Sequence, residues 1–460
     1  MENPRKYDSI VIGSGQAGNP LAFDLAGRGQ KVAIIEKNKV GGSCLNFGCT
    51  PTKTLIASAN LYHRVLEAEE LGIKVSNVEL DFQKVISRKN EVVNSFREGL
   101  EKSIEDNESI DLYKGVGSFK DKNTVKIELN DGGAIEVSAD RIFINTGSKP
   151  SRIPLKGLEH INHLNSTTIM ELDELPEHLL IIGTSYIALE FGQMFRRFGS
   201  QVTMIGRGDQ IIKREDPDVS KRIQKILADE GIEFLLNTDT KAVEMNGQKI
   251  KLLIEKDNQE EKIECSHLML ATGRTPNTEE LDLKNAGVDM DDKGNIKVDE
   301  RLKTTAENIY ALGDVKGGPA FTHISYDDFR IVIDNLYGEG KRTINDRLVP
   351  YTLFTQPQLG RVGITETQAK EKGYDVKIGK LEMKKVGKAI EDNYTEGFMK
   401  AVVDENDNKI LGVSILGYQG GEIMAMVEVA MMAGMTYDKL RDGIFTHPNL
   451  SESLNNLFNI

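Results

Sequence analysis

The sequence predicts an α/β fold that contains two similar parallel-sheet units and ends in an α+β segment. Each unit consists of a short apolar strand, a glycine-containing turn, a helix and a second apolar strand, beginning at Tyr7 and at Leu179. The spacing from Gly13 to Glu36 in the first unit equals the spacing from Gly183 to Gly206 in the second unit. Such a repeat predicts two Rossmann-like units that bind dinucleotides. After about Arg342 the glycine turns cease, and alternating strands with a Met-rich helix predict the α+β segment.

Short apolar runs on either side of a predicted helix are typical of buried parallel strands. In the two units they predict the following elements: strands at Tyr7–Ile12 and Lys31–Glu36 around a helix that ends near Gly29, and strands at Leu179–Ile182 and Gln201–Ile205 around a helix that ends near Gly199. Elsewhere the pattern predicts helices at Phe82–Asn107, Ile324–Leu336 and Glu422–Met435, and strands within Val125–Val137 and at Arg141–Asn145, Leu268–Ala271, Ile309–Leu312, Phe398–Val403 and Lys409–Ile415.

These elements predict four segments. Residues 1–149 contain the first nucleotide-binding unit, and residues 150–270 contain the second. Residues 271–342 follow the second unit, and residues 343–460 form the C-terminal α+β segment. A chain of 460 residues is too long for a single core, which agrees with this division.

Composition excludes several classes of protein. The chain has 58 Lys and Arg against 71 Asp and Glu, a net charge of -13, and no basic tract, so we expect no nucleic-acid partner. No apolar run is long enough to span a membrane, and the N-terminal residues do not have the layout of a signal peptide, so we expect no membrane partner and a cytoplasmic location. Three cysteines are too few for a disulfide scaffold.

The first glycine turn carries a nucleotide-binding pattern. Gly13, Gly15 and Gly18 lie between a predicted strand and a predicted helix, where they allow close approach of a pyrophosphate to the helix N-terminus. Glu36 ends the second strand, the position of a ribose-binding acid. The alternative is a tight strand–helix turn without a ligand. We predict that this unit binds the adenosine part of FAD.

The second glycine turn departs from that pattern. Ser185 and Ala188 replace its second and third glycines, and Gly206 stands at the position that Glu36 occupies in the first unit. Basic residues follow at Arg207, Lys213 and Arg214. A carboxylate would repel a ribose 2′-phosphate, whereas arginine binds one. We therefore predict NADPH, with NADH possible; the alternative for the three basic residues is an ordinary solvated surface.

Cys44 and Cys49 lie shortly after Glu36 and need a chemical explanation. A zinc site would need more ligands, and the third cysteine, Cys265, is far away. A plant-type iron–sulfur site would need a cysteine where Thr52 stands. Two inert buried thiols are the remaining structural alternative. A redox-active disulfide beside a flavin explains the pair best, and we predict no metal-binding residues.

The segment that contains this pair, GGSCLNFGCTPTK, resembles the active-site signature of the pyridine nucleotide-disulfide oxidoreductases. That family includes glutathione reductase, dihydrolipoyl dehydrogenase and mercuric reductase, and the resemblance covers essentially the whole chain. Thr146-Gly147 and Thr272-Gly273 resemble the phrases that return the chain between domains. Ile309–Asp314 resembles the second FAD motif, and His447–Glu452 resembles the C-terminal HPxxxE motif. The resemblance implies that residues 1–149 and 271–342 form an FAD-binding domain and that residues 150–270 form an NAD(P)-binding domain. It also implies that residues 343–460 form an interface domain of a homodimer whose active sites are shared between subunits.

The resemblance assigns separate roles to the two cysteines. Cys44 would be the interchange thiol that reacts with substrate, and Cys49 the charge-transfer thiol beside the flavin ring. His447, supported by Glu452, would act from the other subunit as acid and base for Cys44. These roles are physically reasonable, because a thiolate is the nucleophile in disulfide exchange and imidazole titrates in the right range.

Other residues receive roles from the same resemblance. Lys53 and Glu190 would form an ion pair near the flavin, and Tyr186 would cover the flavin until the nicotinamide displaces it. For Tyr186 the structural alternative is a core tyrosine. The other residues predicted to contact FAD or the nicotinamide nucleotide are Lys37, Gly42, Ser43, Thr146, Gly147, Gly183, Ser185, Ile187, Gly273, Gly313, Asp314, Phe321 and Thr322.

Within the family the sequence indicates a branch but not a substrate. Mercuric reductase receives Hg(II) on a C-terminal cysteine pair and lacks the equivalent of His447, whereas this chain ends SLNNLFNI. The first helix offers no basic residues for glutathione, and dihydrolipoyl dehydrogenase has an acid where this chain has Gly206. Segments 317–332 and 445–455 resemble the reactive-chlorine-resistance flavoproteins, which reduce hypothiocyanous acid or copper and are often labelled mercuric reductases.

We therefore expect electrons to pass from NADPH through FAD to Cys44 and Cys49, and on to a small oxidised thiol, oxidant or metal. A dihydrolipoyl dehydrogenase or a glutathione reductase-like enzyme is the alternative within the family. Two other classes remain open: a flavoprotein subunit of a multienzyme complex without turnover of its own, and an NAD(P)H oxidase that works through one cysteine.

Overall fold

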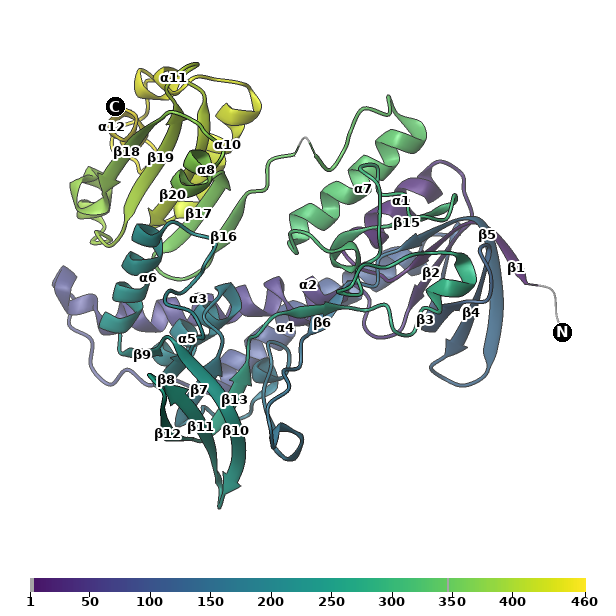
Figure 1. The fold of residues 1–460 in the computed structure, drawn as a ribbon, viewed down its shortest axis with the longest axis horizontal. Helices are drawn as coiled ribbons and strands as arrows, with labels where there is room; N and C mark the ends of the chain where they lie inside the picture. Colours follow the sequence, from purple (N-terminus) through teal and green to yellow (C-terminus); the bar gives the residue numbers. More distant parts are fainter. Residues whose placement is uncertain (1–3, 346) are drawn as a thin grey trace. The chain divides into compact units, whose positions relative to one another are not determined.

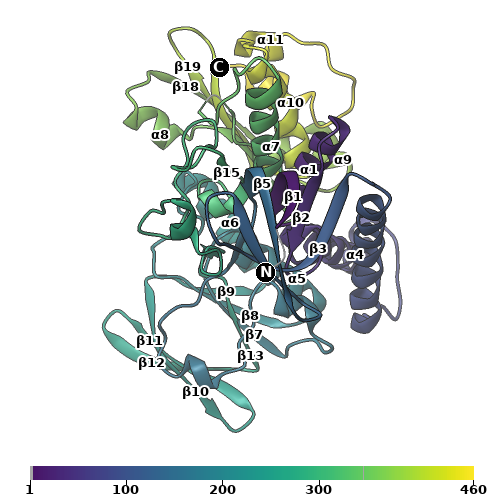
Figure 2. The ribbon, with the colours of Figure 1, turned by 90° about the vertical axis from the view of Figure 1, so that its right-hand side faces the viewer.

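The computed structural model describes residues 4–345 and 347–460 and consists of mixed helices and strands (Figures 1 and 2). Residues 1–3, which begin the segment examined for a signal peptide, lie outside the described part. Two compact units are present. Unit 1 comprises the described residues of Met1–Thr54, Ile86–Ser151 and Gly273–Arg347, and unit 2 comprises Leu55–Val85, Arg152–Thr272 and Leu348–Ile460.

Unit 1 contains a parallel sheet with the strand order β3-β2-β1-β5-β15. Its strands are β1 (Arg5–Ile12), β2 (Val32–Glu36), β3 (Ile110–Phe119), β5 (Ala134–Ile144) and β15 (Ile309–Ala311). β3 and β5 continue beyond the parallel region, where both pair antiparallel with β4 (Thr124–Leu129). β1 and β2 are parallel neighbours, and α1 (Gly18–Gly27) provides the crossover between them.

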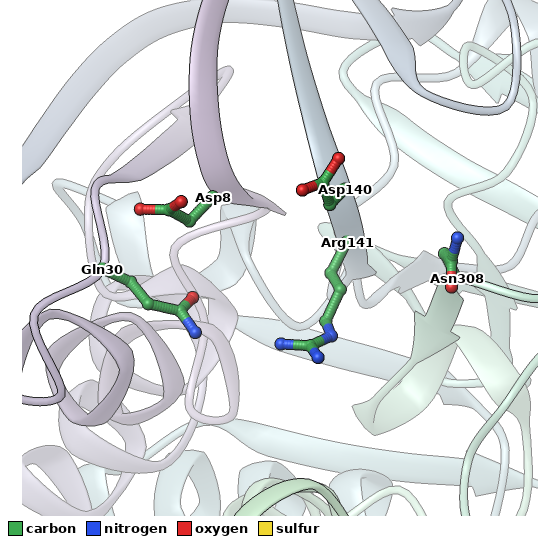
Figure 3. Close-up of a pocket in the computed structure, with 5 residues that line it drawn as sticks. All are labelled: Asp8, Gln30, Asp140, Arg141 and Asn308. Carbon is green, nitrogen blue, oxygen red and sulfur yellow. The ribbon is translucent and has the colours of Figure 1, made fainter.

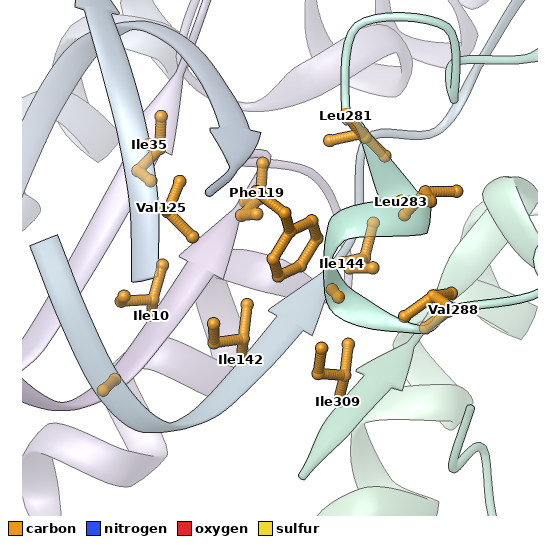
Figure 4. Close-up of a cluster of buried hydrophobic side chains, with 14 of the residues drawn as sticks. Ile10, Ile35, Phe119, Val125, Ile142, Ile144, Leu281, Leu283, Val288 and Ile309 are labelled. Carbon is orange, nitrogen blue, oxygen red and sulfur yellow. The ribbon is translucent and has the colours of Figure 1, made fainter. Parts of the chain in front are cut away.

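Apolar side chains are buried on both faces of this sheet, as a parallel sheet requires. On one face α1 packs beside α7 (Thr322–Tyr337), and Leu21 and Ile331 are buried against the sheet (Figures 1 and 2). On the other face Phe119 lies in a buried cluster with strand residues and with Leu283, which follows the return of the chain at Gly273 (Figure 4). This burial holds the carboxyl ends of the parallel strands, where β1 meets Gly13 and β15 meets Leu312, at one edge.

Unit 2 contains a second parallel sheet with the order β13-β7-β8-β9. Its strands are β7 (His178–Ile182), β8 (Gln201–Ile205), β9 (Ile232–Leu235) and β13 (His267–Leu270), and its helices are α5 (Tyr186–Phe198) and α6 (Pro217–Asp229). An antiparallel sheet follows α6 and β9 in the chain and consists of β10 (Thr238–Asn246), β11 (Lys249–Lys256) and β12 (Gln259–Cys265).

The C-terminal part of unit 2 is an antiparallel sheet with the order β16-β17-β20-β19-β18. Its strands are β16 (Tyr351–Leu353), β17 (Gln358–Gly363), β18 (Val376–Glu382), β19 (Phe398–Asp404) and β20 (Ile410–Gly417). Helix α10 (Gly420–Met432) lies so close to β17 that a Cβ added at Gly360 would stand 2.2 Å from the carbonyl oxygen of Gly420. Glycine therefore permits this packing. The remaining helices here are α8 (Glu366–Glu371), α9 (Gly387–Glu391), α11 (Tyr437–Arg441) and α12 (Ser453–Leu457).

The remaining elements are helices and short strands that connect the sheets described above. They are α2 (Gly42–Phe47), α3 (Cys49–Leu66), α4 (Phe82–Glu105), β6 (Ser148–Pro150) and β14 (Arg274–Pro276), with 3-10 helices at Ala68–Leu71, Leu158–His160, Thr168–Glu171, Leu283–Ala286, Gly313–Lys316 and Met383–Lys385.

The predicted α/β fold with two nucleotide-binding units and an α+β segment is confirmed. One difference in detail is that the predicted strand Arg141–Asn145 is the end of the longer strand β5. The boundaries of the four predicted domains stay a prediction. In the described part of the chain, no helix is both long and apolar enough to cross a membrane.

Candidate active site

The first glycine turn is so tight that it accepts no side chains. A Cβ at Gly13 would lie 2.3 Å from the carbonyl oxygen of Asn145, and one at Gly18 would lie 2.2 Å from that of Gly13. Gly13 also has a φ of 103°, in the region that favours glycine. The N-cap residue of α1 is Ala17, whose side chain cannot cap the helix. This turn fits the pyrophosphate of a dinucleotide, because backbone and helix N-terminus are both approachable.

Glu36 is fixed beneath the turn. Its carboxylate accepts hydrogen bonds from the backbone amides of Ser14, at 2.9 Å, and Asn38, at 2.8 Å. Burial raises the pKa of Glu36 above its ordinary value, although these hydrogen bonds act in the opposite direction. Lys37, next in the chain, is exposed and forms an ion pair with Glu280. The acid predicted to bind ribose is therefore held in place by backbone amides of the turn and of the residue after Lys37.

The second predicted FAD motif lies at the same edge of the sheet. Ser148 donates a hydrogen bond of 2.7 Å to Asp314, and Arg274 approaches the same carboxylate at 3.8 Å. The backbone amide of Gly313 donates to the fully buried Asp328 at 2.8 Å. Asp328 in turn pairs with Lys316 at 3.2 Å and with Arg347 at 2.7 Å. Asp328 thus positions the turn that carries Asp314, a role that sequence reasoning did not assign.

The cysteine segment lies directly against the glycine turn. A Cβ at Gly42 would stand 2.8 Å from the Cα of Gly15, and Gly41 donates a backbone hydrogen bond of 2.9 Å to Ser14. Gly42 begins α2, which carries Cys44, and Cys49 begins α3. The close approach of two backbones therefore brings both cysteines to the nucleotide-binding edge of unit 1.

A single hydroxyl group lies beside both sulfurs. Thr322, the first residue of α7, donates a hydrogen bond of 3.0 Å to the Sγ of Cys44. The same Oγ1 lies 3.4 Å from the Sγ of Cys49. Thr322 was predicted only as a cofactor contact. Phe321, the N-cap residue of α7, stacks on His323 with ring centroids 5.4 Å apart.

The two thiols are electrostatically distinct. Cys44 is partly buried, whereas Cys49 is exposed. The pKa of Cys44 is raised, first by its hydrogen bond to Cys49 and then by burial, while Thr322 acts in the opposite direction. A proton is therefore retained on Cys44, which favours negative charge on Cys49. Cys265, in unit 2, is buried, and burial raises its pKa to about 12, so this thiol is inert.

Arg274 is a second residue that sequence reasoning missed. It follows Gly273 directly and donates hydrogen bonds to the hydroxyl and the backbone carbonyl of Ser148, at 2.7 and 2.6 Å. Burial lowers the pKa of its guanidinium group, but Asp314 and Cys49 act in the opposite direction. Arg274 thus places a positive charge within reach of Cys49. Its position directly after Gly273, in the Thr-Gly-Arg phrase, was the available signal.

In unit 2 the second glycine turn is equally tight. A Cβ at Gly183 would lie 2.3 Å from the carbonyl oxygen of Ala271, and Gly183 has a φ of 132°. A Cβ at Gly206 would lie 2.9 Å from a methyl group of Thr184, so this position does not accept a carboxylate side chain without movement. The three predicted basic residues, Arg207, Lys213 and Arg214, are all exposed on the loop that follows. This turn and loop fit a pyridine nucleotide.

Helix α5 presents the other residues predicted to contact the nicotinamide nucleotide. Ser185 is its exposed N-cap residue, and Tyr186 and Ile187 begin its first turn. Tyr186 donates a hydrogen bond of 3.1 Å to Glu215. Glu190 is buried, and its carboxylate accepts a hydrogen bond of 3.0 Å from the backbone amide of Phe354.

His447 and Glu452 form the predicted pair. The Nδ1 of His447 lies 2.9 Å from a carboxylate oxygen of Glu452, and the His447 side chain is 75% exposed. Asn449 accepts a hydrogen bond of 2.8 Å from the backbone amide of Glu452, which fixes the turn. Since Nδ1 is engaged, Nε2 is the ring nitrogen available for proton exchange.

Unit 1 therefore brings together the first glycine turn, Glu36, Asp314, Thr322 and both cysteines. Unit 2 brings together the second glycine turn, Tyr186 and the basic loop. The Lys53–Glu190 ion pair and the action of His447 on Cys44 stay predictions. Among the residues that the structure describes, no group of three His, Cys, Asp or Glu side chains could hold a metal ion.

A polar hollow of about 330 Å³ lies elsewhere in unit 1 and contains none of the predicted residues (Figure 3). It is lined by Asp8, Gln30, Asp140, Arg141 and Asn308. Asp8 accepts a hydrogen bond from the amide of Lys31 at 2.7 Å, and Arg141 donates to Tyr337 at 2.8 Å. Asn308 directly precedes β15, whereas the cysteines and glycine turn belong to the edge where the strands end, so we assign this hollow no function.

Comparison with known proteins identifies the family. Residues 7–328 match the model described as pyridine nucleotide-disulphide oxidoreductase, and residues 349–458 match its dimerisation domain. The chain is 39% identical over 459 residues to the probable pyridine nucleotide-disulfide oxidoreductase RclA of Escherichia coli, covering 99% of each chain. It is 35% identical over 452 residues to a mercuric reductase of Lysinibacillus sphaericus, covering 98% of this chain and 82% of the relative.

A solved structure agrees with these relatives. The Cu(II) complex of the HOCl-induced flavoprotein disulfide reductase RclA from Escherichia coli superposes with a TM-score of 0.91 at 39% identity, covering 99% of both chains. The chain belongs to the pyridine nucleotide-disulfide oxidoreductase family. It is an FAD-dependent disulfide oxidoreductase that uses a pyridine nucleotide.

Proposed function

We propose that this enzyme transfers two electrons from NADPH by way of FAD to a disulfide between Cys44 and Cys49, and then to a small oxidised substrate. The observation that carries the proposal is the contact of both sulfurs with the hydroxyl group of Thr322, 3.0 and 3.4 Å away. Two thiols that share one partner lie close enough to interact, as the effect of Cys49 on the pKa of Cys44 also indicates.

FAD, when bound, supplies the two-electron chemistry that connects the nicotinamide to the disulfide. The first glycine turn, Glu36 and Asp314 would hold it, and Lys53 is proposed to lie near its ring. Cys49 is the more exposed thiol, and Arg274 favours its thiolate form electrostatically. We therefore assign Cys49 to the flavin side and Cys44 to the substrate side of the pair.

The thiol reaction proceeds through a covalent intermediate in which the Cys44 sulfur is bonded to the sulfur of the substrate. His447 of the partner subunit removes the proton from Cys44, whose raised pKa makes such a base necessary. The Cys44 thiolate attacks the oxidised sulfur of the substrate, and the leaving group departs with a proton from His447. The Cys49 thiolate then attacks the Cys44 sulfur, releases the second product and restores the disulfide. Glu452 orients His447 for both proton transfers.

NADPH is the proposed electron donor. Gly206 has no side chain at the position where an acid would repel a 2′-phosphate, and Arg207, Lys213 and Arg214 are exposed on the loop that follows. Competition between NADPH and NADH at equal concentration tests this preference. A kcat/KM at least tenfold higher with NADPH is expected, and a preference for NADH would contradict it.

We propose that the enzyme works as a homodimer in the cytoplasm. The match to the dimerisation domain supports the dimer, and exposed apolar side chains on α10 offer a surface for it. These include Val429, which is 60% exposed, and Met432, which is 64% exposed. Burial of such side chains in an interface is favourable by roughly 25 cal/mol per Å².

The proposed substrates are small oxidants that one dithiol can reduce directly, hypothiocyanous acid first and Cu(II) second. The likeness to RclA, solved as a Cu(II) complex and described as HOCl-induced, supports this choice. Reduction of hypothiocyanous acid would consume one NADPH and release thiocyanate and water. Dihydrolipoyl dehydrogenase, represented among the relatives at 33% identity, is the second candidate.

NADPH consumption should be measured with hypothiocyanite, Cu(II), Hg(II), oxidised glutathione and oxidised lipoamide. We expect the highest kcat/KM with hypothiocyanite and a loss of at least a thousandfold in Cys44→Ser. Cys265→Ala is the matched control, because this thiol is buried in the other unit, and it should retain activity within about twofold. Full activity in Cys44→Ser, or a preference for lipoamide, would refute the proposal.

A further inference from the structure

A buried carboxylate in unit 2 holds Tyr186, the tyrosine that is expected to cover the flavin until the nicotinamide displaces it. Glu215 has no exposed side-chain surface. One of its oxygens, Oε1, accepts hydrogen bonds from Tyr186 at 3.1 Å and from Tyr351. The rings of these two tyrosines meet edge to face, with centroids 5.4 Å apart. Tyr186 is therefore held by both its hydroxyl group and its ring.

The other side of the carboxylate faces a cation. The Oε2 of Glu215 lies 3.4 Å from the Nε of Arg361, whose side chain is 3% exposed. Neither atom has a hydrogen bond. Arg361 instead donates to the backbone carbonyls of Val362 and Val413, which fixes it in the C-terminal sheet. The side-chain hydrogen bonds that Glu215 receives are therefore concentrated on Oε1, the oxygen that faces Tyr186.

The loop that carries Glu215 is anchored to the second glycine turn. The backbone amide of Ile212 donates a hydrogen bond of 3.0 Å to the carbonyl oxygen of Thr184. The backbone amide of Glu215 donates a hydrogen bond of 3.0 Å to the carbonyl oxygen of Ile212. Ile212 has a φ of 43°, which is unusual for a β-branched residue and shows that the surroundings determine the loop conformation. Arg214, proposed to bind the phosphorylated ribose, immediately precedes Glu215.

We infer that Glu215 is a positioning residue that latches Tyr186 in its closed position and thereby weakens binding of the nicotinamide part of the nucleotide. The inference rests on the proposed covering role of Tyr186. A hydrogen bond to a desolvated carboxylate is stronger than one between neutral groups, so opening has a cost that the nicotinamide must offset. The same bond returns Tyr186 after the nucleotide leaves.

The latch is tested by binding two ligands to the oxidised holoenzyme in a calorimeter. NADP+ contains the nicotinamide, whereas 2′-phospho-ADP-ribose lacks it and reports the adenosine end alone. If NADH proves to be the electron donor, NAD+ and ADP-ribose replace these two ligands. Tyr186→Phe keeps the ring and removes only the hydroxyl group. We expect its Kd for NADP+ to fall about tenfold, with the Kd for 2′-phospho-ADP-ribose changed less than twofold.

Tyr351→Phe is the matched control, because it removes the other hydroxyl group from the same carboxylate oxygen. We expect no fall in its Kd for NADP+, since the bond from Tyr186 to Glu215 is retained. An equal fall in both variants would mean general loosening of the cluster and would overturn the latch. Tyr186→Ala separates the remaining outcomes.

If Tyr186→Ala binds NADP+ more tightly but Tyr186→Phe does not, the ring covers the site without help from Glu215, and the latch is wrong. If neither variant changes the ratio of the two Kd values, Tyr186 does not cover the site, and the latch is again wrong. Neither result affects the reaction of Cys44 with substrate, which the acceptor assay measures independently.

Discussion

Thr322 contacts the sulfurs of two cysteines that differ in burial and in the tendency to lose a proton. Its hydroxyl group donates to Cys44 and lies within contact distance of Cys49. The pair itself was predictable, because two cysteines in a chain with only three required a chemical role. The contact with Thr322 was not, because it joins residues far apart in the chain and depends on where α7 begins. Arg274 escaped prediction for the same reason.

Replacement of Thr322 by valine should slow the reaction of the dithiol. Valine has nearly the same shape but no hydroxyl group, and one hydrogen bond contributes about 0.5–1.5 kcal/mol, which corresponds to a two- to tenfold lower kcat/KM. Steady-state kinetics with the best acceptor measure this effect. Thr322→Ser, which keeps the hydroxyl group, should recover most of the activity. Equal rates for Thr322→Val and wild type would show that the contact has no role.

At the scale of elements, local patterns predicted most helices and strands. The first strand, its glycine turn and α1 are specified by neighbouring residues, and they occur as predicted. The continuity of β5 from Ala134 to Ile144 was not predicted, because its first residues pair antiparallel with β4 and its later residues pair parallel with β1. Polar residues on such an antiparallel extension conceal its strand character.

The glycine turn of unit 1 predicts a sharp difference between two glycines of the same helix. Gly18→Ala should purify with little FAD, since its Cβ would lie 2.2 Å from the carbonyl oxygen of Gly13. Gly27→Ala is the control, because a Cβ at Gly27 has no neighbour within 4 Å. The absorbance ratio of flavin to protein in each purified variant measures retention. Similar FAD content in both would contradict the proposed cradle.

An ion cluster joins three elements of unit 2. Lys400, on β19, lies 3.0 Å from Asp216, which precedes α6, and 2.8 Å from Glu366, the first residue of α8. Burial alone would raise the pKa of Asp216, but the hydrogen bonds from Thr367 and the charge of Lys400 outweigh burial and lower it. As the pH falls, the unfolded chain therefore takes up a proton at Asp216 at a higher pH than the folded protein does.

This lowered pKa gives a pH dependence with a definite sign. The contribution of Asp216 to the free energy of unfolding is fully present above its ordinary pKa of 3.8 and is lost as the pH falls below that value. Lys400→Met should cost about 3 kcal/mol or more at neutral pH, because it leaves the buried carboxylate of Asp216 without its cation. Denaturant titrations from pH 3 to 7 measure both effects.

Lys380→Met is the control for this cluster, since Lys380 pairs with Asp218 at the surface and is 41% exposed. Exposed ion pairs contribute about 0–1 kcal/mol, so its stability should change little. Equal destabilisation by both variants, or a stability that rises below pH 4, would contradict the assignment.

At the scale of the whole molecule, the active site is proposed to be completed by a second chain. His447 and Glu452 form an exposed pair, and His447 is proposed to exchange protons with Cys44 of the partner subunit. The sequence could indicate this through the resemblance of the HPxxxE segment, and the fold was predictable because each nucleotide-binding unit is local. The substrate was not predictable, because a single dithiol can reduce many small oxidants.

Mixing two inactive variants tests the shared site. Cys44→Ser and His447→Ala should each lose most activity, whereas hybrids formed by subunit exchange contain one site with both residues intact. We expect recovery approaching a quarter of wild-type activity for random exchange of equal amounts. Native mass spectrometry verifies the exchange. Hybrids that form without any recovery would show that each chain completes its own site.

The central claim is that electrons from the nicotinamide nucleotide reach the Cys44–Cys49 disulfide. Anaerobic titration of the oxidised holoenzyme with NADPH, followed by absorbance, tests it most directly. In the wild type, a long-wavelength charge-transfer band between the Cys49 thiolate and the flavin should reach its full intensity at two electrons per subunit. The band should also be observed in Cys44→Ser, which keeps Cys49, and it should be absent from Cys49→Ala. A wild-type enzyme without this band, or a Cys49→Ala variant that retains it, would contradict the account.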